Sequence, residues 1–388
     1  MCLGYFTMPM HPFDTEFASF TKGVTETSAK AFEARGEKGN IVMIDGCIKN
    51  CWYVAATAQE LGRDLVGRTF LNEPVVLFRQ KDGTPVALED RCAHRFLPLS
   101  KGRLIGDRIQ CGYHGLEFDD SGACVHAPGQ KSPPESAKLR TFPLAEKWHL
   151  VWIWMGDPAL ADVSLIQDIW RCDHPDWTCI VGEPFHINGN YRLFTDNLLD
   201  PSHVSFVHQS TLGTGDVAEI PQVATQDGST VCVTRWILDR PAAPIYAKLG
   251  GFTSNVDRWQ IMTFTPPSMV EADMGSAVVD TGAPDGDRSQ GIELRSYNIA
   301  TPENEQSCHY FWTHVRNFAL DDAAMSAQIK TGFIEAFSED VDIIESVQAG
   351  LNRYSHLTPV NLAIDGGPVR ARRVIDDLIA VEEGESAS

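Results

Sequence analysis

Two short segments of the chain each offer one thiol and one imidazole. They are Cys92-Ala-His94 and Cys111-Gly-Tyr-His114, and 16 residues separate them. Two loops of this kind could hold an iron–sulfur cluster in which two thiolates bind one iron and two imidazoles bind the other. The alternative is a structural zinc site with two cysteine and two histidine ligands. Zinc loops more often pair cysteine with cysteine and histidine with histidine, so the mixed loops favour the cluster.

A second constellation lies in the segment 196–208, which holds two histidines and two aspartates. His203 and His208 are five residues apart, so a straight helix would point them about 140° away from each other. One metal ion could bind both only if the helix bends or ends between them. A carboxylate from elsewhere in the chain would then complete a two-histidine, one-carboxylate triad, which leaves positions open on iron(II) for dioxygen and substrate. Taken alone, these side chains could also be surface or core hydrogen-bonding groups.

The sequence Cys-X-His followed by Cys-X-X-His-Gly is the Rieske motif, and the chain resembles the oxygenase component of Rieske non-haem iron oxygenases. The resemblance is to the group that includes vanillate and dicamba O-demethylases, and it covers nearly the whole chain after residue 45. It is carried by the two loops and by CWYVAA, DNLLDPSHVSFVH, TPENEQSCHYFW, RNFALDD and FSEDVDIIESVQ. It implies a [2Fe–2S] cluster held by Cys92, His94, Cys111 and His114.

The resemblance also implies a mononuclear iron(II) bound by His203 and His208, with Asp340 of the Ser-Glu-Asp run as the third ligand. Asn197, one turn before Asp200 on the predicted helix, is expected close to this iron. The other acids around Asp340 are expected to be solvated charges on a helix face: Glu339, Asp342 and Glu345.

Asp200 is expected between the two metal centres, because in the family the paired centres belong to neighbouring subunits of a ring-shaped trimer. A carboxylate there could accept hydrogen bonds from His114 of one chain and from His203 of the next. The alternative role for Asp200 is to cap a helix. For the substrate pocket, the resemblance points to the region of Asn298 and Trp312.

Apolar periodicity and turn signals divide the chain into an N-terminal arm (1–43), a β domain (44–158) and a catalytic domain (159–388). The β domain is predicted to contain strands at 51–57, 74–80, 85–90 and 149–155. The last of these should be buried on both faces, because both of its alternating sets of side chains are apolar. The catalytic domain is predicted to contain strands at 230–238, 258–265, 291–300 and 308–315, a helical stripe along 190–208, helices at 321–350 and 371–380, and a frayed tail. The resemblance implies an α+β protein, with a Rieske β domain followed by a helix-grip domain in which a curved antiparallel sheet surrounds a long helix.

The composition excludes several classes of function. Lys and Arg number 32 and Asp and Glu number 52, and the resulting net charge of −20 would repel a nucleic-acid backbone. No apolar run approaches the roughly 18 residues of a membrane span, and the N-terminus does not resemble a signal peptide, so a cytoplasmic protein is expected. Ten cysteines are too few for a disulfide scaffold. Residues 91–108 carry a local net charge of +4, which is either a docking face for an acidic electron donor or a solvated loop.

We therefore expect a trimeric oxygenase component that uses dioxygen and electrons from NADH. The chain has no glycine-rich dinucleotide motif after a strand, so a separate ferredoxin or flavin reductase should deliver these electrons. The expected reaction hydroxylates a methyl group of an aromatic methyl ether or N-methyl compound, and the product collapses to a phenol or amine plus formaldehyde. Ring dihydroxylation and plain hydroxylation are alternatives within this class. Outside it, a Rieske electron-transfer protein would leave the second domain and its histidine pair without a function, and a zinc protein is a third alternative.

Overall fold

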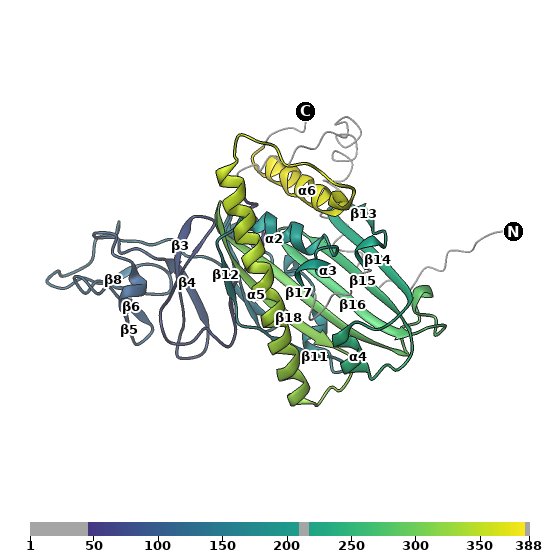
Figure 1. Cartoon of the computed structure of the whole chain (residues 1–388). Coiled ribbons are helices and arrows are strands. Elements are labelled where there is room, and N and C mark those ends of the chain that lie inside the picture. Colours follow the sequence, from purple (N-terminus) through teal and green to yellow (C-terminus); the bar gives the residue numbers. More distant parts are fainter. Residues whose placement is uncertain (1–45, 209–216, 385–388) are drawn as a thin grey trace.

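The chain folds into an all-β part followed by a part built on one large antiparallel sheet, with a long helix across that sheet (Figure 1). The computed structural model describes residues 46–208 and 217–384. The predicted N-terminal arm, residues 1–43, lies outside the described residues. The predicted α+β class, in which a β domain precedes an antiparallel sheet packed on a long helix, is confirmed.

Three small antiparallel sheets make up the N-terminal part. The first consists of β1 (Trp52–Thr57), β10 (Leu150–Trp154) and β9 (Leu144–Lys147). The second consists of β2 (Val66–Phe70), β3 (Glu73–Arg79) and β4 (Pro85–Glu89). The third consists of β5 (Arg103–Ile105), β6 (Arg108–Gln110), β7 (Glu117–Phe118) and β8 (Cys124–His126). The four predicted strands correspond to β1, β3, β4 and β10, whereas most of the others are too short for an alternating pattern to reveal them.

The large sheet has eight strands, seven of them in the order β11-β18-β17-β16-β15-β14-β13, and β12 also pairs with β18. The bounds are β11 (Thr178–Val181), β12 (Phe185–Ile187), β13 (Val223–Asp227), β14 (Thr230–Arg240), β15 (Val256–Thr265), β16 (Met269–Val278), β17 (Gly291–Asn304) and β18 (Ser307–Arg316). The four predicted strands of this region lie within β14, β15, β17 and β18. The structure adds β16, which joins β15 to β17.

Helices cover one face of this sheet (Figure 1). They are α2 (Tyr191–Leu198), α3 (Val204–Val207), α4 (Pro244–Gly250), α5 (Ala323–Arg353) and α6 (Gly366–Glu382). Helix α5 matches the predicted helix at 321–350, and the carboxylate of Asp322 caps it by accepting a hydrogen bond from the N–H of Met325 (2.9 Å). No helix in the described part of the chain is both long and apolar enough to cross a membrane.

Two expectations about helices are wrong. The helical stripe predicted along 190–208 is interrupted after Leu198, because Pro201 has no N–H to continue a helix and disfavours the helical conformation of the residue before it. The tail is not frayed at Glu382, which lies in α6 and accepts hydrogen bonds from the main-chain N–H groups of Lys49 (2.8 Å) and Asn50 (2.6 Å). The end of α6 is thereby tied to the start of the β domain.

The opposite face of the large sheet packs on the N-terminal part. Strand β10 is buried on both faces, as its sequence predicts. One set of its side chains, which includes Val151 and Ile153, packs within the N-terminal part. The other set, which includes Trp152 and Trp154, packs in a cluster with side chains of β17 and β18 such as Phe311. The large sheet thus lies between the β part and the helices.

Candidate metal centres

The two cysteine–histidine loops share one backbone design. In the first loop, the N–H of Cys92 donates to the carbonyl of Leu97 (2.8 Å) and the N–H of Phe96 donates to the carbonyl of Cys92 (2.9 Å). The same two bonds recur around Cys111, at 2.8 and 3.1 Å. The fourth residue after each cysteine is left-handed, with φ of 55° at Phe96 and 75° at Gly115. Two loops of equal geometry therefore present their ligands as a matched pair.

The thiols of these loops are buried and the imidazoles are exposed. Cys92 and Cys111 are 2% and 3% exposed, and burial beside the Cys111 thiol raises the pKa of Cys92. The rings of His94 and His114 lie at the surface with centroids 4.6 Å apart. Two inner sulfur atoms and two outer nitrogen atoms fit a cluster with one iron inside the protein and the other at its surface. The structure thus brings the four predicted cluster ligands together.

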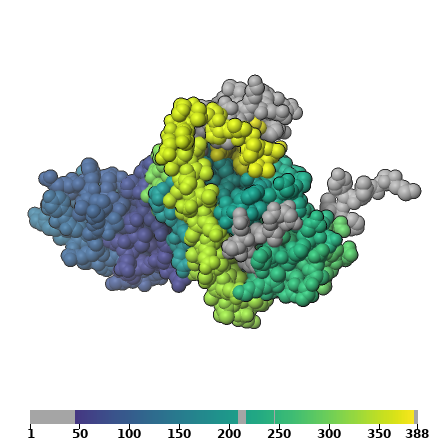
Figure 2. All heavy atoms as spheres, viewed as in Figure 1, coloured from purple at the N-terminus to yellow at the C-terminus, as the bar shows by residue number. Residues whose placement is uncertain are grey.

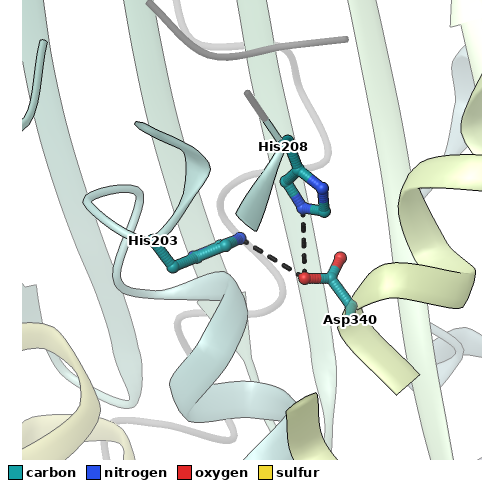
Figure 3. Close-up of side chains that lie close together, drawn as sticks. All are labelled: His203, His208 and Asp340. Carbon is teal, nitrogen blue, oxygen red and sulfur yellow. Dashed lines mark ion pairs between the residues drawn. The ribbon is translucent and has the colours of Figure 1, made fainter. Parts of the chain in front are cut away.

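His203, His208 and Asp340 converge on one point (Figure 3), and their ligand atoms lie within 4.8 Å of one another. Oδ1 of Asp340 is 3.5 Å from Nε2 of His203 and 3.1 Å from Nε2 of His208. The two histidines flank the four-residue helix α3, and His208, at φ −103° and ψ 40°, has left the helical conformation. Because α3 ends before His208, the five-residue spacing does not keep the two imidazoles from facing the same point. Helix α5 brings Asp340 to the same point.

Each histidine uses its other ring nitrogen in a hydrogen bond. Nδ1 of His203 lies 2.6 Å from the main-chain carbonyl oxygen of Asp200, and Nδ1 of His208 lies 2.7 Å from Oε2 of Glu339. Because both partners are acceptors, Nδ1 of each ring serves as the donor, and each Nε2, which faces Asp340, is left as the atom that would bind a metal. Two imidazole lone pairs and one carboxylate oxygen are the donor set of a two-histidine, one-carboxylate iron site. The residues present fit such an iron.

The two imidazoles have different electrostatic environments. Burial lowers the pKa of His203, and the charge of Asp340 offsets this only in part. Burial also acts on His208, but the carboxylates of Asp340 and Glu339 outweigh it and raise the pKa of that ring. These carboxylates favour positive charge at this point, which a bound cation would supply in place of a proton.

The expectation for the acids around Asp340 needs correction. Glu339 is not only a solvated charge: its side chain is 40% exposed, but its carboxylate also accepts the hydrogen bond from His208. Glu345 also has partners, since its Oε1 accepts from the main chain (2.8 Å) and the amide (2.9 Å) of Asn188. Asp342 is exposed, as expected. One of the three acids thus supports the candidate metal ligands directly.

The expected contact between His203 and the carboxylate of Asp200 is wrong. The main-chain carbonyl of Asp200 takes that position, and Oδ1 of its carboxylate accepts from the N–H of Ser202 (3.0 Å). A short aspartate side chain readily closes such a local turn, but the N-cap residue of α3 is His203, so Asp200 does not take the capping role either. The contact with His114 of a neighbouring chain stays a prediction.

The remaining predicted site residues lie in the layer between the sheet and the helices. Asn197 of α2 donates to Oδ1 of Asp340 (3.0 Å), beside the candidate metal ligands. The amide of Asn298 donates to a main-chain carbonyl (3.1 Å) and accepts from the hydroxyl of Tyr310 (2.8 Å). The indole N–H of Trp312 donates to the carbonyl of residue 183 (3.0 Å). Contacts of Asn298 and Trp312 with substrate stay predictions.

One arginine that the sequence analysis did not single out ties the metal-binding loop to the sheet. Arg235 of β14 is 1% exposed and donates to the hydroxyl of Ser202 (2.7 Å) and to the carbonyl before it (3.2 Å). It thereby fixes the backbone that leads into His203. The signal was present in the sequence, because alternation in TVCVTRWIL puts Arg235 in the same inward row as Val231 and Val233.

Comparison with known proteins agrees with both centres. Residues 51–143 match the Rieske [2Fe-2S] domain, and residues 187–381 match the Vanillate O-demethylase oxygenase C-terminal domain. The toluene-4-sulfonate monooxygenase system iron-sulfur subunit of Comamonas testosteroni is 41% identical over 88% of this chain and 99% of that protein. The dicamba O-demethylase oxygenase component of Stenotrophomonas maltophilia is 36% identical over 86% and 98%. The crystal structure of dicamba monooxygenase bound to 3,6-dichlorosalicylic acid has a TM-score of 0.81 and 35% identity, covering 88% and 99%.

Fold, site and matches define the class of this protein as a Rieske oxygenase component, which is an oxidoreductase. Within that class, the chain belongs to the family of the vanillate and dicamba O-demethylase oxygenase components. The predicted family is thus confirmed, and the zinc alternative for the first centre is excluded by the Rieske match. A related crystal structure of dicamba monooxygenase with non-haem iron and dicamba has a TM-score of 0.75 and 34% identity, covering 87% of this chain and 98% of that one.

Proposed function

We propose that this chain is a terminal oxygenase that hydroxylates a methyl group bound to oxygen or nitrogen in an aromatic compound. The observation that supports this most is the held pair of imidazoles, His203 and His208, with both Nε2 atoms turned toward Asp340. Three protein ligands leave positions open on iron(II), and iron bound there would supply the reductive activation of dioxygen. Relatives named as vanillate O-demethylase, dicamba O-demethylase and chloroacetanilide N-alkylformylase support attack on a carbon bound to oxygen or nitrogen.

The proposed reaction balances with two electrons and two protons. One oxygen atom of dioxygen enters a methyl C–H bond, and the other leaves as water. The resulting hydroxymethyl ether or amine releases formaldehyde and leaves a phenol or an amine. In this reaction Asn197 holds Oδ1 of Asp340, while Asp200 and Glu339 hold the two rings. The apolar layer that includes Phe194, Tyr310 and Phe337 excludes water from this part of the protein.

A second candidate reaction stops at the alcohol. The relative from Comamonas testosteroni is named as part of a toluene-4-sulfonate monooxygenase system, and it shares 41% identity with this chain. A methyl group bound directly to a ring has no heteroatom to act as a leaving group, so its hydroxylation would give a stable benzylic alcohol. The same site would serve either reaction, and the substrate would decide the product.

The two centres of one chain lie far apart, which supports electron transfer between subunits. Cys111 directly follows β6, and Figure 1 shows β6 at the end of the molecule remote from α3. We therefore include in the proposal a homotrimer in which the cluster of one chain serves the iron of its neighbour, with Asp200 between them. Electrons would come from NADH through a separate ferredoxin or flavin reductase.

Residues 91–108, with their local net charge of +4, form a basic loop that supports an acidic protein as the electron donor. Arg91 and Arg108 pair with nearby glutamates, whereas Arg95, Lys101 and Arg103 form no ion pair with any described residue. Reversing the charge of Arg95 and Arg103 should raise the Michaelis constant for the donor several-fold at low salt and leave dithionite-driven turnover unchanged. An unchanged Michaelis constant would show that the loop is merely solvent-exposed and does not bind the donor.

A single turnover tests the proposed reaction without the natural donor. The protein, loaded with cluster and iron and reduced under anaerobic conditions, is mixed with ¹⁸O₂ and one compound from a panel of methoxy-, N-methyl- and methyl-substituted aromatics. The proposal predicts substrate-dependent oxygen uptake with formaldehyde and a demethylated product, or an ¹⁸O-labelled benzylic alcohol. A cis-diol would establish ring dihydroxylation instead. Oxidation of the cluster with no product from any compound would indicate an electron-transfer protein.

A further inference from the structure

The segment that carries both candidate iron-binding histidines has little secondary structure of its own. His203 and His208 flank α3, whose four residues make about one helical turn. A helix of this length is not stable by itself, because its first turn fixes several backbone angles for very few hydrogen bonds. The residues around the segment must therefore fix the directions of the two imidazoles.

Arg235 reaches this segment from β14, and all of its donors are in use. It is 1% exposed, and Figure 2 shows α5 and α6 forming the outer surface on this side of the sheet, in agreement with that burial. A guanidinium has five N–H groups in a rigid planar fork. Arg235 makes five hydrogen bonds, one from each of these groups. Its side chain therefore has one well-defined position.

Two of the five acceptors lie directly before His203. The carbonyl of Pro201 accepts from Nη1 of Arg235 (3.2 Å), and the hydroxyl of Ser202 accepts from Nη2 (2.7 Å). The main-chain carbonyl of Asp200, one residue earlier, holds the imidazole of His203 through Nδ1. Because these three residues are consecutive, fixing two of them also restricts the carbonyl that orients the ring.

Two further acceptors lie after His208, where the chain enters β13. The carbonyl of Ile220 accepts from Nε of the arginine (3.0 Å), and Oε1 of Gln222 accepts from Nη2 (3.1 Å). The fifth acceptor is Oε1 of Gln260 (3.4 Å), on the neighbouring strand β15. One guanidinium thus joins the residues that lead into the histidine segment to the residues that follow it, and it anchors both to the sheet.

The charge of Arg235 does not explain its place beside a metal site. Burial lowers the pKa of Arg235 and the charge of Asp200 offsets this in part, but an arginine keeps its proton in a protein. A fixed positive charge here would oppose a metal cation, whereas the carboxylates of Asp340 and Glu339 favour one. The arginine therefore supports the site through the geometry of its hydrogen bonds.

We propose that Arg235 is a positioning residue of the mononuclear iron site, which sets the directions of His203 and His208 by holding the chain on both sides of them. This inference rests on the proposed function, because it concerns the iron that the proposed reaction requires. Arg235 contacts neither of the two imidazoles through its printed hydrogen bonds and acts through the backbone between them and the sheet. Without its donors, the two Nε2 atoms should be directed less precisely toward Asp340.

The test measures iron(II) binding and ligand geometry separately from turnover. Protein that keeps its cluster, but from which the mononuclear iron has been removed, is titrated with iron(II) under anaerobic conditions. The iron(II)-loaded protein is then exposed to nitric oxide, whose complex with iron(II) gives an EPR signal that depends on the arrangement of the protein ligands. The EPR signal of the reduced cluster shows in each variant that the β part is intact.

Three variants and one control separate geometry from other effects. Arg235→Met removes all five donors, Arg235→Lys keeps the charge and some of the donors, and Ser202→Ala removes a single acceptor. Arg316→Met is the matched control, because Arg316 is also buried and donates to main-chain carbonyls and to the hydroxyl of Ser326. Ser326 lies about 21 Å along the axis of α5 from Asp340.

Arg235→Met should weaken iron(II) binding by about tenfold or more and broaden the EPR signal of the nitric oxide complex. Arg235→Lys should lie between this variant and the wild-type protein, and Ser202→Ala should weaken binding by a smaller factor. Arg316→Met should keep the affinity and the signal of the wild-type protein, even where it lowers the free energy of unfolding.

An affinity and a signal equal to those of the wild-type protein in Arg235→Met would overturn the inference, and so would an equal loss in Arg316→Met. If Arg235→Met does not fold, Ser202→Ala decides, and an unchanged affinity for iron(II) in that variant would overturn the inference as well. The proposed function fails separately: a wild-type protein that binds no iron(II) at this site would count against the proposed function itself.

Discussion

At the scale of single residues, the second ring nitrogen of each histidine decides how well the site can hold a metal. The resemblance to known oxygenases predicted His203, His208 and Asp340, and the structure brings these three together. It did not predict Glu339, because neighbouring residues on a helix point about 100° apart and Asp340 was expected to face the metal alone. The side chain of Glu339 is long enough for its carboxylate to reach Nδ1 of His208 in spite of this difference in direction. Contacts of this kind depend on tertiary geometry that no local pattern encodes.

Glu339→Gln should therefore weaken iron(II) binding without affecting the cluster. The loss of the charged acceptor leaves His208 less firmly oriented and less basic, and such partners contribute about 10–100-fold in metal affinity. The measurement is an anaerobic iron(II) titration of protein from which only the mononuclear iron has been removed. Glu335→Gln is the control, since Glu335 is exposed one turn earlier on α5. Equal affinities for iron(II) in the two variants would remove this role from Glu339.

One buried histidine and one half-buried histidine should make folding stability depend on pH. Burial lowers the pKa of His309 to about 4 and that of His314 to about 3, whereas both titrate near 6.5 in the unfolded chain. Below pH 6.5 the unfolded chain binds more protons than the folded one, so the free energy of unfolding should fall as pH drops toward 4. Each histidine contributes at most about 1.4 kcal/mol per pH unit to this slope.

Denaturant unfolding between pH 7 and 5 checks this dependence. His314→Leu should reduce the slope, because one of the two groups is gone. It should also raise the stability at pH 7 by about 1–3 kcal/mol, since it removes a buried polar group that has no hydrogen-bond partner among the described residues. A slope equal to that of the wild-type protein would show that His314 is protonated in the folded state.

At the scale of elements, close contacts between strands set the shape of the layer around the site. Trp312 of β18 packs so tightly on Gly182, just beyond β11, that a Cβ there would lie 1.9 Å from its ring. The sequence predicted most long strands and the long helix because their apolar side chains recur with clear periods. It could not predict the break before α3 from periodicity, although Pro201 gave a local signal, nor the small strands near the cluster.

Gly182→Ala should destabilise the protein by about 1–3 kcal/mol, because Trp312 or the backbone must move to make room. The free energy of unfolding by denaturant is the measurement. Gly332→Ala is the opposite case, since no atom of the described residues lies within 4 Å of its Cβ position in the middle of α5. That change should stabilise the helix by roughly 0.5–1 kcal/mol. If both substitutions changed the free energy of unfolding in the same direction, the close contact at Gly182 would not constrain the packing.

At the scale of the whole molecule, the residues for the two metal centres of an oxygenase lie in different parts of the chain. The β part carries the cluster ligands at one end, and the sheet with its helices carries the second site (Figure 1). The motifs predicted both parts and their order, because cysteine and histidine spacing is local to short loops. The motifs could not predict the contacts between the sheet and the helices, since residues such as His314 and Phe333 meet only after β18 and α5 have packed.

The central claim is that one chain holds both a Rieske cluster and a separate iron at His203, His208 and Asp340. Iron and acid-labile sulfide are measured per chain in anaerobically purified protein supplied with iron(II), together with the EPR spectrum after dithionite reduction. The account predicts about three irons and about two sulfides, with the signal of a histidine-ligated cluster. Asp340→Asn should keep that signal and both sulfides but hold only about two irons. Two irons in the wild-type protein, unchanged by added iron(II) and equal to the count in Asp340→Asn, would contradict the claim.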